Sequence, residues 1–148
     1  MQLRKPISVL VIIYNYAHQF LLIKRTDDAN FWQSVTGGVE QNESLLETAY
    51  RELKEETGID AHALGIKIKD HKSINQYEIR PCWRHRYIEG ANMNTEHVFS
   101  ICVPNDIKIT LNPHEHTHYE WLTQKAAVLR AWSPSNQKEI RSIKSNSQ

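Results

Sequence analysis

The most constraining feature of the sequence is a short amphipathic helix, predicted between Ser44 and Gly58. Apolar side chains recur here at three- and four-residue steps, the spacing of one face of an α-helix. These side chains are Leu45, Leu46, Ala49, Tyr50 and Leu53. Ser44 followed by Glu47 forms a capping-box start, and Gly58 is a natural stop. The start, the apolar face and the end of this helix are therefore all indicated by the sequence.

Runs of apolar and β-branched residues predict strands on both sides of this helix. The predicted strands are residues 7–14, 20–25, 63–80, 97–104 and 118–122. Residues 27–38 are expected to form a loop. The segment from Thr123 to about Lys144 is expected to form one or two helices, interrupted at Ser133-Pro134. Strands around an early helix, closed by a late one, predict an α/β fold in which a mixed sheet is covered on both faces.

Length and charge limit the choices further. The 148 residues suit one domain, spanning residues 1–148, and the formal net charge of +1 gives no sign of a nucleic-acid or membrane partner. Cys82 and Cys102 are too few for a disulfide framework and lack zinc-knuckle spacing. The apolar run Ile7–Ile13 is too short and β-branched for a secretory signal, and nothing approaches a membrane span. These features predict a cytoplasmic protein.

Three carboxylates crowd one face of the predicted helix. Glu55 lies three residues after Glu52 and Glu56 lies four, so all three project from the same side. Like charges at this spacing repel one another unless a cation lies against them. Mg²⁺ takes oxygen ligands and is often held by one or two carboxylates together with substrate phosphates. The pattern predicts a metal site, with a solvated acidic face as the alternative.

The residues around these acids follow a fixed spacing. It reads Gly37, five residues, Glu43, seven residues, Arg51-Glu52-Leu53, one residue, Glu55-Glu56, one residue, Gly58-Ile59. In this spacing the chain resembles the Nudix hydrolase family. Arg51 is expected to steady the carboxylates by pairing with Glu55 or with Glu47.

The resemblance implies an α/β/α sandwich, a mixed β-sheet flanked by helices, and hydrolysis of a nucleoside diphosphate linked to another group. It also implies dependence on Mg²⁺, which Mn²⁺ can replace. By the same resemblance the catalytic residues are Glu52, Glu55 and Glu56, of which Glu52 and Glu56 are metal ligands and Glu55 a further ligand or the base. Bound metal would neutralise the diphosphate and activate a water for in-line attack. The number of metals and the identity of the base stay open.

Outside this motif the chain resembles one group within the family, the bacterial dihydroneopterin triphosphate pyrophosphohydrolases of folate synthesis. The matching stretches are RKPISVLVIIY, RTDDANFWQSVTGGVE, RHRYIEG with NTEH, and EHTHYEWL followed by AAVLRAWS. The resemblance implies that Glu115 is a further metal ligand. It also implies a set of substrate contacts: Arg4, Arg25, Thr36, Tyr77, Glu78, Ile79, Arg80 and Ala131. Ala131 departs from the group's pattern, because a hydroxyl side chain is expected at that position.

The chemistry of some of these side chains suits the implied substrate contacts. For each residue, an ordinary structural role is the alternative. A guanidinium group presents a fork that suits phosphate oxygens, and an aromatic ring such as Tyr77 can cover a flat pterin. Trp32 and Trp132 line the ring pocket or belong to the core. The triplet Arg84-His85-Arg86 attracts the triphosphate or pairs with nearby acids.

A rival motif lies at residues 114–118. His114-Glu115-His116-Thr117-His118 satisfies the two-histidine pattern of zinc proteases. That pattern requires a helix, whereas these residues lead into a predicted strand. On a strand the three histidines would share one face and Glu115 the other. We therefore expect Glu115 to face the acidic helix and the histidines to face solvent.

Together, the residues and the resemblance predict a monomeric, Mg²⁺-dependent hydrolase. It would convert dihydroneopterin triphosphate to dihydroneopterin monophosphate and pyrophosphate. Its partner would be a small-molecule triphosphate, with no nucleic acid or membrane involved. One alternative is a Nudix enzyme acting on ordinary or damaged nucleoside triphosphates. The other is a Nudix-fold binding module without turnover, disfavoured because every carboxylate of the motif is present.

Overall fold

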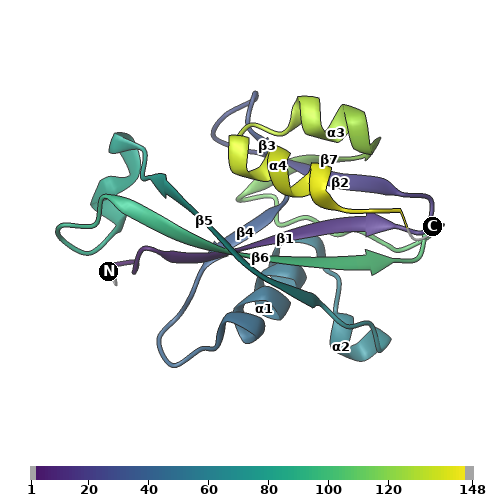
Figure 1. The fold of residues 1–148 in the computed structure, drawn as a ribbon, viewed down its shortest axis with the longest axis horizontal. Coiled ribbons are helices and arrows are strands. Elements are labelled where there is room, and N and C mark those ends of the chain that lie inside the picture. The colour runs from purple at the N-terminus through teal and green to yellow at the C-terminus, as the bar shows by residue number, and fades with distance from the viewer. Residues whose placement is uncertain (1–2, 146–148) are drawn as a thin grey trace.

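The computed structural model describes residues 3–145, whose strands form one mixed sheet with helices on both faces (Figure 1). The strands are β1 (Ile7–Asn15), β2 (Gln19–Arg25), β3 (Trp32–Gln33), β4 (Val35–Gly38), β5 (Lys69–Glu78), β6 (Met93–Val103) and β7 (His116–Thr123). The helices are α1 (Leu45–Thr57), α2 (Ala61–Leu64), the 3-10 helix η1 (Pro81–Arg86), α3 (Gln124–Arg130) and α4 (Pro134–Ser142). The expected mixed sheet flanked by helices is confirmed.

Strand β1 is central, and its two edges have different partners. Strand β6 runs parallel to β1 along its whole length, from Ile7 opposite Thr95 to Asn15 opposite Val103. On the other edge, residues 8–11 pair with β4, whereas Tyr14 pairs with β2. Strand β2 then continues the sheet through β3 and β7. The sheet therefore divides on this edge, where β4 lies beside the first half of β1 and β2 lies beside its end.

Two apolar layers hold the helices against the sheet. Successive residues of a strand point to opposite faces, and β1 is apolar on both, so it supplies both layers. Val9 and Val11 pack with α1 residues such as Leu53, while Leu10 packs with α3 and α4 residues such as Ile140. Figure 1 accordingly shows α1 and α2 on one side of the sheet and α3 and α4 on the other.

Helix α1 has the bounds that the sequence predicts. The Ser44 hydroxyl accepts a hydrogen bond from the Glu47 amide, and the Glu47 carboxylate accepts one from the Ser44 amide. Gly58 adopts φ +77°, and its N–H donates to the Lys54 carbonyl. The capping box and the left-handed glycine satisfy backbone groups that every helix leaves unpaired at its ends.

Some segments differ from the expectation, among them β6, which begins at Met93 rather than at residue 97. Residues 27–38, expected to be a loop, contain β3 and β4, and Val35–Gly38 pairs with β1. The glycine pair concealed this strand, because glycine weakens strand propensity. The strand expected over residues 63–80 begins only at Lys69, after the short helix α2. The division of the C-terminal segment at Ser133-Pro134 is confirmed, since α4 starts at Pro134. Among residues 3–145, no helix has the length and apolarity needed to span a membrane.

Candidate active site

A cavity of about 930 Å³ brings together most of the residues predicted to form the site. The predicted residues that line it are Arg4, Arg25, Thr36, Glu52, Glu55, Glu56, Tyr77, Glu78, Ile79, Arg80 and Glu115. These residues come from elements far apart in the sequence, so the fold itself assembles the group.

Ala131 lies elsewhere. It is buried in the apolar layer under α3 and α4, and its carbonyl accepts a hydrogen bond from Gln137 at 2.8 Å. The hydroxyl residues that line the cavity near this point are Ser133 and Ser135. The wall next to Ala131 therefore offers hydroxyl groups from the turn that leads into α4.

Glu56 is the buried member of the acidic face. Its side chain is 3% exposed, and its Oε1 atom has no hydrogen-bond partner. Burial, followed by the neighbouring Glu52 carboxyl and then Glu115, raises the pKa of Glu56 well above its ordinary value. A buried carboxylate oxygen without a partner is costly unless a cation or a proton compensates for it.

The carboxylates of α1 fit a divalent cation in chemistry, although they do not converge in the conformation described. Among residues 3–145, no three acidic, histidine or cysteine side chains are gathered around one point. The Glu52 carboxylate is turned toward Arg51, and Glu55 is more than half exposed. The partnerless Oε1 of Glu56, with oxygen donors from Glu52 and Glu55 on the same face, is the donor set that a hard cation prefers.

Gly37 lets Glu52 approach the sheet. A Cβ atom at residue 37 would lie 2.1 Å from the Glu52 Cδ atom, far inside contact distance. At Gly38, by contrast, the nearest atom to such a Cβ is the Ile7 carbonyl oxygen at 4.0 Å. Glycine is therefore needed at residue 37 because a carboxylate occupies the place of its side chain.

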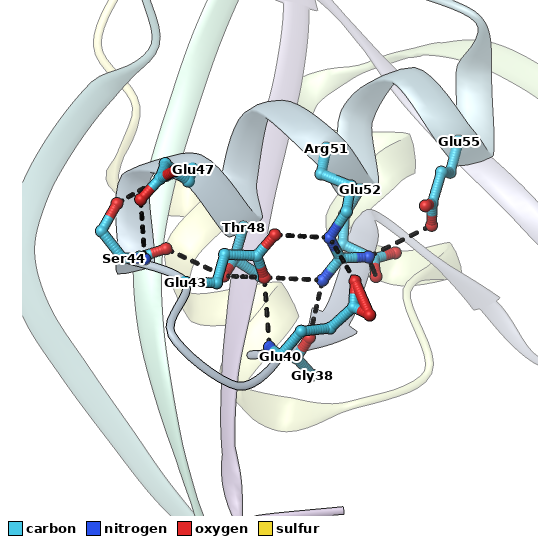
Figure 2. A network of polar contacts seen from close by, with 9 residues as sticks. All are labelled: Gly38, Glu40, Glu43, Ser44, Glu47, Thr48, Arg51, Glu52 and Glu55. Atoms are coloured by element: carbon cyan, nitrogen blue, oxygen red, sulfur yellow. Dashed lines mark hydrogen bonds and ion pairs between the residues drawn. The ribbon is translucent and has the colours of Figure 1, made fainter.

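Arg51 connects the loop before α1 to the acidic face (Figure 2). Its guanidinium donates two hydrogen bonds to Glu43, at 2.7 and 2.9 Å, and one to the Gly38 carbonyl at 3.0 Å. It also donates to Glu52 at 2.7 Å and to Glu55 at 3.2 Å. The predicted pairing with Glu55 is confirmed, whereas Glu47, the other expected partner, closes the capping box instead. Arg51 hydrogen bonds lower the pKa of Glu43 to about 2.

An arginine-rich aromatic cluster forms another part of the cavity wall. The rings of Phe31 and Trp132 are stacked with centroids 4.4 Å apart. The Arg80 guanidinium lies 4.6 Å from the Trp83 ring centroid and 5.0 Å from that of Trp132. Arg25 lies 4.9 Å from the Trp83 centroid. The cluster places cations over ring faces, and these cations also suit phosphate oxygens.

Of the other aromatic and basic residues considered from the sequence, Trp32 packs against the apolar layer of α3 and α4. Phe31 and Trp83 line the cavity although sequence reasoning did not place them there. For Trp83 the available signal was the basic triplet that Trp83 and Tyr87 flank. Within the triplet, Arg84 pairs with Glu78, whereas Arg86 lines the cavity.

The expectation that all three histidines of residues 114–118 face solvent is wrong for His116. His114 and His118 are exposed, but His116 is buried, with Nε2 3.2 Å from the Gln33 amide nitrogen and 3.9 Å from Glu56. The cause is a register shift: Lys24 pairs with His118 while the next residue of β2 pairs with His116. The extra residue in β7 breaks the alternation of side chains that the prediction assumed. Burial, and then Arg25, lowers the pKa of His116 to about 4.

The zinc protease alternative has no structural support. Residues 113–115 form a turn and β7 begins at His116, so the helix that this pattern requires is not formed. Glu115 lines the cavity from that turn, together with the α1 carboxylates. Its placement on the cavity side agrees with the expectation, although it precedes the strand rather than lying within it.

Sequence reasoning missed a buried polar group at another part of the cavity. Glu96 and Asn94 of β6, with Asn75 of β5 and Ser8 of β1, are buried and line the cavity beside Tyr77, which the sequence did predict. Burial raises the pKa of Glu96 to about 7. The stretch NTEH contains Asn94 and Glu96, but polar residues in a strand are ordinarily taken to face solvent.

Comparisons with known proteins agree with this geometry. A family model described as the NUDIX domain matches residues 4–142. The chain is 39% identical over 138 residues to the dihydroneopterin triphosphate diphosphatase of Escherichia coli K12, covering 93% of this chain and 91% of that protein. It is 34% identical over 142 residues to the enzyme of the same name from Haemophilus influenzae, covering 95% and 89%. The solved structure of the E. coli dihydroneopterin triphosphate pyrophosphohydrolase superposes with a TM-score of 0.89 at 38% identity, covering 96% and 97%.

Proposed function

The chain belongs to the Nudix hydrolase family, and from this we propose that it hydrolyses dihydroneopterin triphosphate to dihydroneopterin monophosphate and pyrophosphate. The observation that carries the proposal is one cavity holding the α1 carboxylates, an arginine-rich aromatic wall and a buried polar group. Likeness to relatives with this activity in their names covers nearly the whole chain, and so includes the substrate-facing elements as well as α1.

Enzymes of this family depend on a divalent metal, and we propose Mg²⁺ as the ion, with Mn²⁺ able to replace it. Glu52, Glu55, Glu56 and Glu115 would hold it. When bound, the cation supplies charge neutralisation on the diphosphate and lowers the pKa of a water ligand. The partnerless Oε1 atom of Glu56 supports this assignment.

The chain's own residues would hold and orient the triphosphate. Arg4, Arg25 and Arg80 line the cavity and can neutralise phosphate oxygens, while Thr36 lies beside Gly37 on β4. Arg25 is itself oriented by a two-pronged hydrogen bond to Asp27, at 2.8 Å on each side. Arg51 positions Glu52 from outside the substrate path. The exposed Glu55 carboxylate is available to accept the proton of the attacking water, or to serve as a further ligand.

The proposal also includes the domain organisation, oligomeric state, cellular compartment and partners of the protein. We expect residues 1–148 to form one domain that acts as a monomer in the cytoplasm, on a small-molecule triphosphate and without nucleic acid or membrane. The near-neutral net charge supports the expectation that neither nucleic acid nor a membrane is a partner.

The direct experiment follows pyrophosphate release from several triphosphates. The purified protein is incubated with Mg²⁺ and dihydroneopterin triphosphate, ordinary nucleoside triphosphates or an oxidised guanine nucleotide. We expect kcat/KM to be highest for the pterin. A higher value for a nucleotide would favour the alternative enzyme that acts on ordinary or damaged nucleotides. No release from any of them would favour a binding module.

Replacing Glu56 tests the metal assignment. Glu56→Gln should lower kcat by about 100-fold or more, because it removes a ligand charge where the metal binds. Glu115→Gln should cause a smaller loss. Glu47→Gln is the matched control, since Glu47 lies on the same helix but caps its start away from the cavity. Rates near that of the wild type for Glu56→Gln, in a folded protein, would remove the metal assignment.

A further inference from the structure

The pairing of the strands sets the distance between the buried polar residues of the cavity, such as Glu96, and the end of the cavity where the metal is proposed to bind. Glu96 on β6 pairs with Ser8 on β1, and Ser8 pairs with Gly38 on β4. Adjacent strands lie about 4.8 Å apart, which separates the Cα atoms of Glu96 and Gly38 by about 10 Å. The neighbouring Gly37 contacts Glu52, so one elongated ligand can reach both ends.

Glu96 is a buried carboxylate with few donors. Its side chain receives hydrogen bonds at 3.5 Å from the Tyr77 hydroxyl and at 3.5 Å from the Asn75 amide, and Ser135 also contributes. The Asn75 amide makes its shorter bond, 2.9 Å, to Glu139. Across residues 3–145 no lysine, arginine or histidine lies within ion-pair distance of Glu96. Both of its oxygens therefore retain capacity to accept hydrogen bonds.

Asn94, two residues before Glu96 on the same face of β6, also has an oxygen that can accept a further hydrogen bond. Its amide nitrogen donates to the Ser8 hydroxyl at 2.7 Å and to the Tyr77 hydroxyl at 3.0 Å, which uses both amide hydrogens. Its Oδ1 atom is buried without a partner, in a residue that is 2% exposed and lines the cavity. The free capacity of both groups facing the cavity is thus for accepting hydrogen bonds, and a ligand that satisfies them must donate hydrogen bonds.

We propose that Glu96 and Asn94 bind the edge of a 2-amino-4-oxopyrimidine ring, accepting hydrogen bonds from its ring N–H and its 2-amino group. The inference rests on the proposed function and names the residues that recognise the ring. An ionised carboxylate has two acceptor oxygens and suits two adjacent donors. Pterins and guanine present such a pair, whereas adenine and cytosine present a donor beside an acceptor.

In this assignment Glu96 determines which ring is bound and takes no part in the hydrolysis of the phosphates. The ring edge lies at one end of the cavity and the reacting phosphates at the other, so loss of the contact should weaken binding more than it slows the bound substrate. A site built to bind N–H donors rejects analogues that lack them, because its buried acceptors are then left unpaired.

The test compares Glu96→Gln with Glu139→Gln. Glu139 is a buried acid in the same hydrogen-bonded group, but it does not line the cavity, so it controls for lost charge and altered packing. For dihydroneopterin triphosphate we expect Glu96→Gln to raise KM by about 10- to 100-fold with kcat within about 3-fold. Glu139→Gln should leave both parameters within about 3-fold. Equal effects of the two variants would overturn the proposal.

A second measurement needs no turnover. Neopterin is fluorescent and lacks phosphates, so its binding can be titrated directly without metal. The wild type should bind it, guanosine should compete and adenosine should not, and Glu96→Gln should weaken binding at least 10-fold. Equal competition by adenosine would contradict the assignment. A wild type that binds neopterin but releases no pyrophosphate from its triphosphate would instead count against the proposed function alone.

Discussion

At the scale of the residue, the site depends on close approaches that composition does not reveal. Glu52 occupies the space of a missing side chain at Gly37, and Arg51 fixes it from the other side. The sequence predicted the acidic face correctly because three carboxylates at helical spacing are a local pattern. It failed for His116, whose burial depends on one extra residue in β7. It also failed for Glu96, because its burial depends on neighbours in β1 and β5.

Gly37→Ala should therefore impair catalysis while leaving the fold intact. The added Cβ displaces only the end of the flexible Glu52 side chain, so we expect kcat/KM to fall by about 10-fold or more with little change in melting temperature. Gly38→Ala is the control, since its Cβ would have no contact closer than 4.0 Å. Steady-state kinetics and thermal unfolding of both variants check this. Equal losses of activity would show that chain flexibility, rather than Glu52, is what the glycine at residue 37 supplies.

At the scale of the element, α1 was predictable to the residue, and β4 was not predictable at all. The bounds of α1 follow from its own sequence, since Ser44, Glu47 and Gly58 satisfy its terminal backbone groups locally. Strand β4 is four residues long, contains the glycine pair and exists only because β1 offers it an edge. The local sequence therefore specifies α1, whereas pairing with β1 specifies β4.

Replacing Gly58 tests how closely the end of α1 packs against the segment around Thr110. Both Gly58 and Gly65 have positive φ angles, +77° and +69°, so alanine at either should cost about 1 kcal/mol. At Gly58, however, the new Cβ would lie 3.0 Å from the Thr110 Cβ, whereas at Gly65 nothing lies within 4 Å. We therefore expect urea unfolding to show a larger loss for Gly58→Ala than for Gly65→Ala. Equal losses would mean that the segment around Thr110 moves aside freely.

At the scale of the whole molecule, Glu96 should contribute to how the free energy of unfolding changes with pH. The folded protein raises the pKa of Glu96 from 4.5 to about 7. Between these values the folded chain keeps a proton that the unfolded chain has lost, so the contribution of Glu96 to stability falls as pH rises. The shift corresponds to about 3 kcal/mol once both values are passed. The protein therefore gives up stability at neutral pH to keep an acceptor in its cavity.

Glu96→Gln should reverse this loss. The amide cannot ionise, so the variant should gain up to about 3 kcal/mol in the free energy of unfolding over the wild type above pH 7. The two proteins should converge as pH falls toward 4.5. Urea unfolding of both proteins at pH 5 and pH 8 checks this. Parallel behaviour at the two pH values would indicate that Glu96 ionises in the folded state as it does in the unfolded one.

The position of β1, with β4 on one edge and β6 on the other, has a consequence for how such a protein can change. The acids of α1 and their supporting arginine belong to one continuous segment, residues 37–58, whereas Glu96, Asn94, Asn75 and Tyr77 belong to the β5–β6 pair on the far side of β1. In a chimaera that exchanged β5 and β6 with those of a relative, we expect the preferred ring to change while the segment that carries the α1 carboxylates stays the same. The residues proposed to bind the ring and the carboxylates of α1 therefore lie on separate stretches of the sequence.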